Sequence, residues 1–551
     1  MRKLGILSNV TMDIVAEKLR KFFHVYIPDG FDTWISEIMS PSSEIYSSAI
    51  DALFVILDGT ELIRQSDEEQ EQKILFWKNA IKTLAVQTDK LLFVSTIDFR
   101  ESNIKTYNEK RSYYSKNNDW YQFIQKLSDD YKNFYVLDLL QKITEIGRNY
   151  FYSPKMWYMG SMPYGKQGIQ AISEVIIFAM EAAFESRKKI LVLDMDNTLW
   201  GGIIGEHGLD GIILSNYNEG ARFYDFQQKI LEMKERGVIL AINSKNNKSD
   251  AMEAFDHPFM VLKKDDFVNL KINWNDKASN IKEIESELNL TEGAFVFIDD
   301  NPMEREIVAG QCTEVYVPPF PSDTVELASF AEQLYQEKFQ TLRLTDEDFQ
   351  KTQMYQQENQ RNDLKVKAAN IEEYIKQLSI KANIHQIRET EWERVHQLCN
   401  KTNQFNLTTK RYSLQDIQTL SSSNDIDIFT VSTEDKFGDN GLISVIILKK
   451  EKTDVIIDSF LMSCRVMGRK LEYVIIGLLI RYYKDNFQNL IGEFIKTTKN
   501  IPVRNLYDEL GFEIIESQEN YRKYHYLLSK GYDLVDVYDK IIFNGEEISE
   551  H

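Results

Sequence analysis

The fold of the middle of this chain is decided by the stretch ILVLDMDNT, residues 190–198. Its first four residues are apolar and predict a short buried strand, and Asp194 and Asp196 follow directly. Two carboxylates two residues apart at the end of a strand can face one cavity without being adjacent. One can attack phosphorus while the other protonates the departing oxygen and later activates water. The stretch therefore predicts a strand that ends in a phosphoryl-transfer site.

Three more stretches follow in order and carry matching chemistry. Ser244 ends the next predicted strand and could hold a phosphoryl oxygen. Lys277 stands at a predicted helix start, where a cation can neutralise developing charge. Asp299 and Asp300 follow a later strand, and an acidic pair there would complete an oxygen cage for Mg²⁺. Any one of these could be an ordinary strand-end turn, but all four in this order predict one site at the carboxyl edge of a sheet.

The chain on either side of this block divides into further parts. Residues 1–185 alternate short apolar runs with amphipathic ones, which predicts a mostly parallel α/β sheet. Three prolines close the middle block, and a charged helical connector follows them. The remaining chain mixes strands with helices in an α+β pattern. The predicted strands are 4–8, 53–57, 91–95, 134–137, 190–193, 238–243, 294–298, 427–431, 441–448, 455–462 and 491–495, and the predicted helices include 68–84, 120–131, 220–236, 471–483 and 503–510. The predicted parts are 1–185, 186–322, 323–375 and 376–551.

Composition limits the classes of function. At 551 residues the chain is too long for one core. Its 65 Lys and Arg against 85 Asp and Glu give a net charge of −20, which argues against non-specific binding of nucleic acid or of an anionic membrane. Its three scattered cysteines predict neither a disulfide framework nor a zinc site, and a reducing cytoplasm is the simplest setting. The N-terminus does not read as a signal peptide, and the longest apolar run, 474–480, is too short to span a bilayer. We therefore expect a cytoplasmic protein without a membrane segment.

The spacing of the four stretches predicts an uncovered site. Asp194 and Ser244 are 50 residues apart, and Ser244 and Lys277 are 33 apart. The predicted strands, helix and turns use up both intervals and leave no room for a covering domain. An open site suits a substrate that is carried by a large partner.

These residues and their order resemble the haloacid dehalogenase superfamily of aspartyl-phosphate enzymes, over about 188–320. The resemblance implies a Rossmann-like, capless middle domain in which Asp194 forms the aspartyl-phosphate. Asp196 would be the general acid and base, with its backbone carbonyl at the metal. Ser244 and Lys277 would bind the phosphoryl group, and Asp194, Asp299 and Asp300 would hold Mg²⁺.

The residues beside these stretches complete the site that the resemblance implies. Asn197 and Thr198 follow the first aspartates, and Lys245 and Asn246 follow the serine. All four are expected to line the substrate.

The C-terminal part contains a glycine loop, MSCRVMGRK at 462–470, between a predicted strand and a predicted helix. Backbone amides at such a turn form an anion site that the helix N-terminus aids. With the later stretch NLYDELGF, 505–512, the loop resembles the acetyl-CoA-dependent N-acetyltransferase fold. The resemblance implies that Arg465 and Gly468 contact the pyrophosphate of CoA, but Lys470 departs from the small residue usual at the loop's end. A CoA site, a phosphopantetheine groove and a purely structural loop therefore all stay open.

Three further stretches resemble the FkbH-like family: NKTNQFNLTT at 400–409, FGDNG at 437–441 and DNTLWGG at 196–202. Its members pair a dehalogenase-type domain with an acetyltransferase-like one. They take a glyceryl group from 1,3-bisphosphoglycerate, remove phosphate and load the glyceryl onto an acyl carrier protein. Such proteins often have cysteine just before the second-stretch serine, where this chain has Asn243. Cys464 is the alternative thiol for a thioester, unless it is only a small buried hydrophobe.

The N-terminal part faintly resembles the SGNH-type hydrolases, or more generally a flavodoxin-like sheet, because Ser8 ends its first predicted strand. A serine nucleophile needs a histidine base. His24 is the only histidine before residue 207, and no Asp-x-x-His stretch closes this part. We therefore expect Ser8 to be structural and this part to be a scaffold or docking module.

The sequence thus predicts a magnesium-dependent phosphatase and acyl transferase. Its substrate would be a phosphorylated three-carbon acyl donor, and its partner would be an acyl carrier protein. The alternatives are a small-molecule phosphatase whose last domain docks a partner, and a non-enzymatic scaffold in a biosynthetic assembly.

Overall fold

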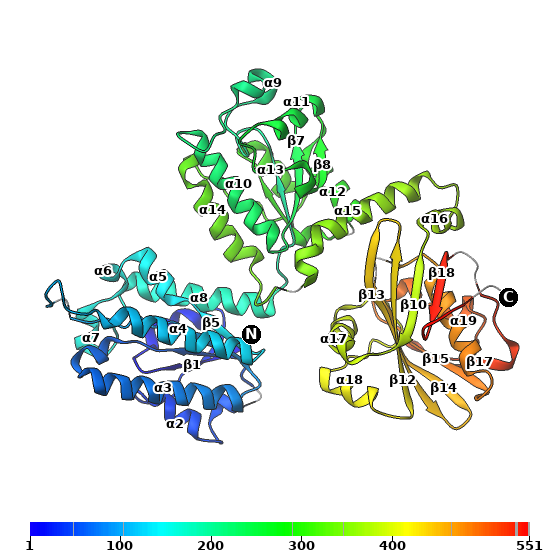
Figure 1. The fold of residues 1–551 in the computed structure, drawn as a ribbon, viewed down its shortest axis with the longest axis horizontal. Helices are drawn as coiled ribbons and strands as arrows, with labels where there is room; N and C mark the ends of the chain where they lie inside the picture. The colour runs from blue at the N-terminus through cyan, green and yellow to red at the C-terminus, as the bar shows by residue number, and fades with distance from the viewer. Residues whose placement is uncertain are drawn as a thin grey trace. The chain divides into compact units, whose positions relative to one another are not determined.

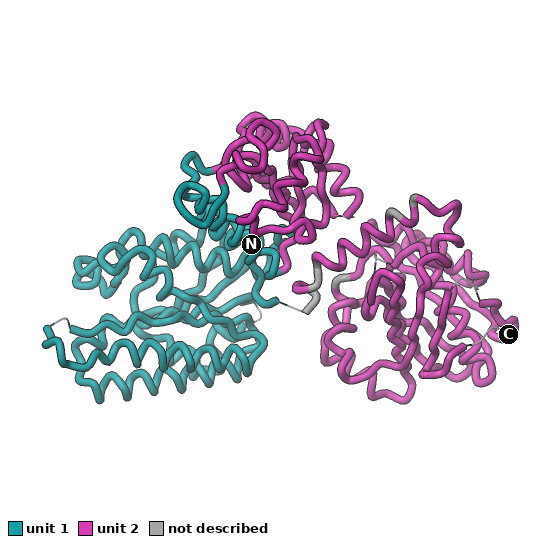
Figure 2. The backbone as a smooth tube through the Cα atoms, turned by 45° about the horizontal axis from the view of Figure 1, so that its top comes forward, with its two compact units in different colours: residues 1–189, 214–236, 321–345 teal, residues 190–213, 237–320, 346–551 magenta. Residues whose placement is uncertain are grey.

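The computed structural model describes residues 1–551 except 48, 103, 289, 345, 464–465, 535–537 and 549–551; the side chains at 346, 347, 350, 351, 363, 366 and 401 are not described either. The chain forms two compact units, which Figure 2 colours separately. The first contains residues 1–189, 214–236 and 321–345. The second contains residues 190–213, 237–320 and 346–551.

A five-stranded parallel sheet forms the middle of the first unit. Its strands lie in the order β2-β1-β3-β4-β5, and each neighbouring pair is parallel, as crossover helices require. The strands are β1 (Lys3–Ser8), β2 (His24–Tyr26), β3 (Ala52–Ile56), β4 (Leu91–Ser95) and β5 (Phe134–Leu137). The helices are α1 (Asp13–Leu19), α2 (Trp34–Met39), α3 (Asp67–Gln87), α4 (Ser112–Asp130), α5 (Leu139–Ile146), α6 (Arg148–Phe151), α7 (Pro154–Gly160) and α8 (Lys166–Phe184).

Helices cover both faces of this sheet (Figure 1). Alternate side chains of β3 enter two different cores, since successive side chains of a strand point to opposite faces. Phe54 packs in the core that includes α1, α5 and α8, whereas Leu53 and Val55 pack in the core that includes α2, α3 and α4. The apolar runs that predicted these strands are therefore runs of a sheet buried on both faces.

Among the described residues, only α8 is long and apolar enough to cross a membrane by length and composition, with a mean hydropathy of 1.2. Its side chains Ile169, Ile172 and Ile176 are at most 7% exposed and belong to the core beneath the sheet. From the sequence, the longest apolar run was 474–480, because only uninterrupted apolar residues were counted there. Of the apolar window of α8, 39% is buried inside the protein.

Two helices of the first unit come from later in the chain. They are α10 (Gly220–Glu235) and α14 (Leu327–Leu334). Lys229 of α10 pairs with Glu332 of α14 at 2.9 Å, and Arg222 donates to the Thr324 hydroxyl at 3.0 Å.

The second unit contains a four-stranded parallel sheet in the order β8-β7-β6-β9. The strands are β6 (Ile190–Leu193), β7 (Ile239–Ser244), β8 (Phe267–Ile272) and β9 (Phe295–Ile298), and the helices are α9 (Ile204–His207), α11 (Lys248–Glu253), α12 (Lys277–Leu288) and α13 (Pro302–Gln311). Strand β8 was not predicted because Lys271, on its outer edge, breaks the apolar pattern. Lys271 pairs with Glu283 and Glu287 at 2.8 and 2.7 Å.

A ten-stranded mixed sheet forms the rest of the second unit. Most neighbouring strands are antiparallel, but β14 pairs with β15, and β10 with β18, in parallel. The strands are β10 (Lys381–Gln386), β11 (Phe405–Asn406), β12 (Ile426–Asp435), β13 (Gly438–Glu451), β14 (Asp454–Met462), β15 (Asn489–Ile495), β16 (Glu513–Ser517), β17 (Tyr521–Leu527), β18 (Lys540–Phe543) and β19 (Glu546–Glu547). The helices are α15 (Asp346–Lys367), α16 (Ile371–Leu378), α17 (Trp392–Lys401), α18 (Leu414–Ser421), α19 (Leu471–Tyr483) and α20 (Leu506–Glu509).

The predicted fold class is confirmed: the chain is mixed α/β, with parallel sheets followed by an α+β part. One predicted helix, 503–510, is shorter in the structure, where only α20 is helical and 501–503 forms a 3₁₀ turn. The division into four parts stays a prediction.

Candidate active site

Three strands of the four-stranded sheet bring the predicted residues to one edge. Strand β6 lies between β7 and β9, and Leu193 is level with Ile242 and Ile298 in its two neighbours. Asp194 follows Leu193, and its backbone N–H donates to the Ile298 carbonyl at 3.0 Å. Because parallel strands end at the same edge, Asp194, Ser244 and Asp299 are neighbours in space although far apart in sequence.

Lys277 is the cation at the centre of this site. It begins α12, and its side chain is only 3% exposed. Its Nζ lies 3.0 Å from Oδ1 of Asp194 and 2.5 Å from Oδ2 of Asp299. Burial alone would lower the pKa of Lys277, but the charges of Asp194 and Asp299 outweigh burial and raise it. Lys277 is therefore held as a cation between two carboxylates.

Three carboxylates at this edge can hold one metal ion. One oxygen from each of Asp194, Asp299 and Asp300 lies within 4.8 Å of the others. Burial, followed by the charge of Asp194, raises the pKa of Asp299 to about 6 and also raises the pKa of Asp300. Buried carboxylates gathered this closely need a cation to stay ionised, and oxygen ligands suit Mg²⁺. The residues fit the predicted metal.

Asp196 stands apart from this trio. One of its oxygens accepts hydrogen bonds from Trp200 Nε1 and from the Ile204 backbone, each at 3.0 Å. The other accepts from Asn246 Nδ2 at 2.8 Å. The predicted substrate residue Asn246 therefore orients Asp196. These three hydrogen bonds fix the position of the Asp196 carboxylate, which does not belong to the group of three carboxylates that could hold a metal ion.

The turn after β6 explains why Asn197 and Thr198 occur there. Asn197 has a φ of +54°, a left-handed conformation that asparagine tolerates better than most residues. Its side-chain oxygen accepts from the Gly202 N–H at 2.9 Å and closes the turn. Thr198 is fully buried, and its hydroxyl has no hydrogen-bond partner among the described residues. These contacts give Asn197 a structural role beside the site. The Thr198 hydroxyl, in contrast, makes no hydrogen bond to a described residue.

Lys245 does not pair with the carboxylates that Lys277 contacts. Its Nζ pairs with Glu304 of α13 at 2.6 Å, and the Lys245 side chain is about one-third exposed. Ser244 is 1% exposed at the end of β7, next to the Lys277 site.

Sequence reasoning missed two groups that position these residues. Asn243 is fully buried; its amide donates to the Lys277 carbonyl at 2.9 Å and accepts from Asn280 at 2.9 Å. Arg305 donates from one nitrogen to the carbonyls of Asp299 and Asp300, at 2.7 Å each. The polar Asn243 at the end of an apolar strand was the available signal, and it was interpreted only as a missing cysteine. Asn243 instead anchors the start of α12.

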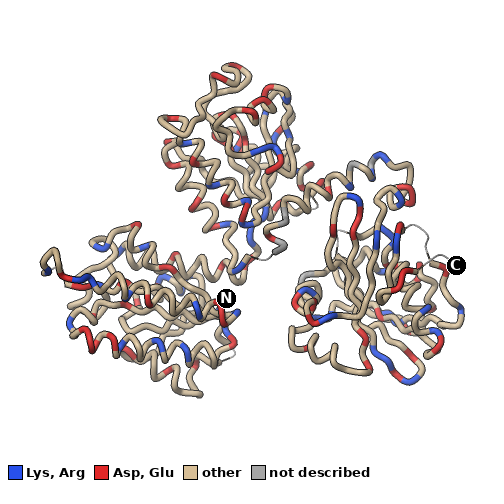
Figure 3. Tube along the Cα trace, viewed as in Figure 1, with Lys and Arg blue, Asp and Glu red and all other residues tan. Residues whose placement is uncertain are grey.

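In the predicted anion loop of the C-terminal part, the described basic side chains form ion pairs with carboxylates of the protein itself. Arg465 and Cys464 lie outside the described residues, and Gly468 has a φ of +75° that favours glycine. Arg469 is buried and lies 3.4 Å from both Asp435 and Glu358, and Lys470 pairs with Glu372 at 2.8 Å. Figure 3 shows Lys and Arg interspersed with Asp and Glu along the trace. These pairs leave neither Arg469 nor Lys470 free for a pyrophosphate.

The gap between β14 and β15 is also filled by the chain itself. The two strands pair only from Asp454 to Ile457. Beyond that point β11 pairs with β14, the Leu407 N–H donates to the Phe460 carbonyl at 3.1 Å, and the Ile495 N–H donates to the Leu407 carbonyl at 2.8 Å. The stretch 400–409 thus supplies a strand that completes the sheet. The described residues here do not fit CoA.

Ser8 and His24 of the N-terminal sheet do not lie together. The Ser8 hydroxyl accepts from the Val10 N–H at 3.2 Å. His24 pairs in register with Lys3, five residues along β1, so it lies roughly 16 Å from Ser8 at the other end of the strand. His24 therefore cannot act as the base for Ser8.

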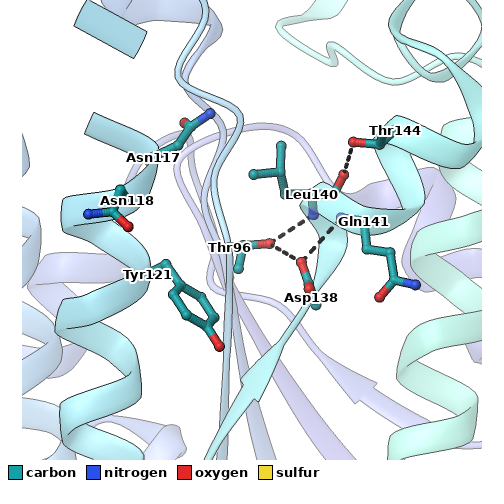
Figure 4. Close-up of a pocket in the computed structure, with 8 residues that line it drawn as sticks. All are labelled: Thr96, Asn117, Asn118, Tyr121, Asp138, Leu140, Gln141 and Thr144. Carbon is teal, nitrogen blue, oxygen red and sulfur yellow. Dashed lines mark hydrogen bonds between the residues drawn. The ribbon is translucent and has the colours of Figure 1, made fainter. Parts of the chain in front are cut away.

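A pocket of about 380 Å³ opens at the carboxyl ends of β4 and β5 (Figure 4). Its polar groups bond to one another: Thr96 donates to Asp138 at 3.1 Å and accepts from the Leu140 N–H at 2.8 Å. The Gln141 N–H also donates to Asp138, which caps α5. These bonds join Thr96 and Asp138 to the start of α5 and stabilise the fold there.

Comparison with known proteins supports the phosphatase-like part. No protein-family model and no curated protein sequence matches this chain. The N-terminal part of protein BF1531 from Bacteroides fragilis, a structure containing a phosphatase domain complexed with Mg, covers 62% of this chain and 95% of its own, with 26% identity and a TM-score of 0.55. Spermidine N-acetyltransferase from Vibrio cholerae, in complex with CoA and spermine, covers 27% of this chain and 96% of its own, with 17% identity and a TM-score of 0.23. That score is too low to carry a conclusion. The site and the first likeness together indicate an enzyme with a phosphatase-like domain.

Proposed function

We propose that this protein is a magnesium-dependent phosphatase and acyl transferase. It would dephosphorylate a phosphorylated three-carbon acyl donor such as 1,3-bisphosphoglycerate and load the acyl group onto an acyl carrier protein. The observation that carries the proposal is the position of Lys277 Nζ, 3.0 Å from Asp194 and 2.5 Å from Asp299 in a buried site.

The phosphoryl step uses the two aspartates after β6. An Asp194 oxygen attacks the phosphorus of the phosphate ester, and the bond from phosphorus to the ester oxygen breaks. Asp196 gives a proton to that oxygen. Water then attacks the phosphorus of the aspartyl-phosphate, Asp196 takes the water proton, and phosphate leaves with Asp194 restored. Lys277 neutralises charge that develops on the phosphoryl oxygens.

Asp194, Asp299 and Asp300 would hold Mg²⁺, with the Asp196 backbone carbonyl as a further ligand. When bound, Mg²⁺ supplies positive charge that binds the phosphate and stabilises its developing negative charge. Arg305 keeps the strand end that carries Asp299 and Asp300 in place through their carbonyls.

The acyl step needs a thiol. The acyl phosphate of the donor is an activated carboxyl, so a thiol sulfur can attack its carbonyl carbon while the bond to the phosphate oxygen breaks. Cys312 and Cys399 are buried, and burial raises their pKa to about 11 and about 12, so neither is a ready thiolate. We infer that the carrier's own thiol accepts the acyl group, with Cys464 as the remaining cysteine of this chain.

A carrier partner is supported by exposed apolar side chains next to the site. Trp274 is 69% exposed and donates from Nε1 to Asn247, the neighbour of Asn246. Met303 is 67% exposed, and its N–H bonds to Asn301, next to the metal-binding pair. Exposed apolar groups from two separate segments, the turn before α12 and the first turn of α13, suit a protein surface that covers an otherwise open site.

A phosphatase whose last domain only docks a partner is the second candidate. It is favoured by Asn243, which replaces the expected cysteine and is fully hydrogen-bonded, and by the internal pairing of Arg469 and Lys470.

One experiment separates the candidates. The full chain with Mg²⁺ is incubated with 1,3-bisphosphoglycerate and a pantetheinylated carrier protein. Phosphate release together with a mass gain on the carrier supports the first candidate, phosphate release alone supports the second, and neither product points to the non-enzymatic scaffold. Asp194→Asn should abolish release of phosphate from the phosphate ester because an amide cannot attack phosphorus, whereas Asp225→Asn, at an exposed position on α10, should retain it. Turnover by Asp194→Asn would refute the assignment of the nucleophile.

A further inference from the structure

A second, smaller cavity lies in the first unit at the carboxyl ends of β3 and β4. Its volume is about 190 Å³, below the roughly 300–1,000 Å³ of sites for drug-sized ligands. Thr60, which follows β3, and Arg100, which follows β4, line one side of it, and α7 contributes Trp157 and Tyr158. In open α/β sheets this edge is where ligands bind. The cavity suits a small ligand or one end of a larger one.

Arg100 is fixed in this cavity with part of its guanidinium unused. It stacks on Tyr152, with its Cζ 3.8 Å from the ring centroid, and it donates to the Thr60 hydroxyl. Its Nε is buried and has no hydrogen-bond partner among the residues that the structure describes. The carboxylates of Asp58 and Asp98 lie 4.0 Å from its nitrogens, beyond hydrogen-bond distance. A buried guanidinium N–H without an acceptor favours an incoming oxygen ligand.

The carboxylates near Arg100 are weak competitors for it. Asp98 is already bound by Arg148, whose Nε and Nη2 donate at 3.0 and 2.6 Å. Burial raises the pKa of Asp58 despite the opposing effect of Arg100, so its charge is disfavoured. Arg148 thus satisfies Asp98, and neither carboxylate is within hydrogen-bond distance of Arg100.

Arg64 adds a second cation to the cavity, and it lies over two aromatic rings. Its Cζ lies 5.9 Å from the Trp157 ring centroid and 5.8 Å from that of Tyr158, and no carboxylate of a described residue forms an ion pair with it. Tyr158 is 78% exposed. An arginine that lies over two aromatic rings can bind an anion while the rings contact a flat group attached to that anion.

We propose that this cavity binds a small oxyanion, a carboxylate or a phosphate, that is joined to a flat or apolar group. Arg64 and Arg100 bind the oxyanion, and Trp157 and Tyr158 contact the attached group. This gives the N-terminal domain a ligand site of its own that is independent of the phosphoryl-transfer site. No bond is made or broken there.

The test uses the full chain without Mg²⁺, with benzoate and phenylphosphonate as separate probes and neutral benzamide as the uncharged control. Hydrogen–deuterium exchange locates the segments that each probe protects. We expect protection of segments 60–64 and 152–158 by at least one anionic probe and none by benzamide. Protection by benzoate alone identifies a carboxylate site, and protection by phenylphosphonate alone identifies a phosphate site.

Two variants test the residues. Arg64→Gln should weaken binding of the anionic probe roughly ten-fold or more, the loss expected for a charge-assisted hydrogen bond. Arg64 is exposed, so the substitution spares the fold, and Arg20→Gln, an exposed arginine outside the cavity, is the matched control. Equal binding by Arg64→Gln and Arg20→Gln, or protection only around 243–247, would overturn the proposal.

Discussion

Replacing Lys277 with methionine should both destabilise the protein and slow phosphate release. The substitution keeps most of the side-chain volume but removes the charge that lies 3.0 Å from Asp194 and 2.5 Å from Asp299. Lys277 is 3% exposed, so water cannot replace its Nζ. Removing one partner of a buried ion pair costs about 3–5 kcal/mol of unfolding free energy, and we expect Lys277→Met to lose that amount without Mg²⁺.

Mg²⁺ should restore part of the unfolding free energy that Lys277→Met loses. A divalent cation among the same carboxylates stabilises the folded state by about 2.7 kcal/mol when its concentration is a hundred times its dissociation constant. The rate should not recover, because loss of one preorganised positive group costs roughly 10²–10³ in kcat.

Urea denaturation with and without Mg²⁺, together with a phosphate-release assay, measures both effects. Lys271→Met is the matched control, since Lys271 also pairs with two carboxylates in this part of the chain, but both are largely exposed. Such pairs contribute about 0–1 kcal/mol. If Lys277→Met were no less stable than Lys271→Met and released phosphate within ten-fold of the wild-type rate, the assignment of Lys277 would be wrong.

Three further predictions follow from the same site. Asn243→Ala should lose about 2–3 kcal/mol of unfolding free energy and lower kcat more than it changes KM, because two buried hydrogen bonds that position Lys277 disappear; unchanged kcat would contradict this role. Trp274→Ala should raise KM for a carrier-bound substrate and leave KM for a small phosphate ester unchanged, and an equal rise for both would exclude carrier docking there. In metal-free protein the pKa of Asp299 is about 6 when folded and about 3.9 when unfolded. The folded state therefore binds more protons, and stability should fall by about 2–3 kcal/mol as the pH rises from 4 to 7; Mg²⁺ should reduce this slope, and a slope of opposite sign in urea denaturation would refute the pKa direction.

The strands and their acidic ends were predictable because each depends on a local pattern. Ile190–Leu193 is a continuous apolar run followed by Asp194, and a strand buried on both faces requires such a run. Strand β8 was missed because Asn269 and Lys271 interrupt its apolar pattern; both side chains bond to glutamates of α12. Strand β9, the other edge strand of this sheet, is apolar throughout and was predicted, so the apolar pattern decided the outcome and not the place of the strand in the sheet.

The roles of single polar residues were less predictable. Asn243 was interpreted as a lost cysteine, but its environment is set by Lys277 and Asn280, which lie 34 and 37 residues further on. The loop 462–470 was expected to form an anion site, but its Arg469 lies 3.4 Å from Asp435 and from Glu358. Such partners come from distant parts of the chain, and no local pattern identifies them.

By itself, the sequence determined which residues end the buried strands and which of them carry charge, because hydrophobic periodicity and turn chemistry act over a few residues. Only the tertiary structure decided that Lys277 would lie between Asp194 and Asp299, that Asp196 would be held by Asn246, and that the segment 405–408 would fill the gap between β14 and β15. Strand order and register bring these groups together, and both are set by the packing of the whole sheet against its helices.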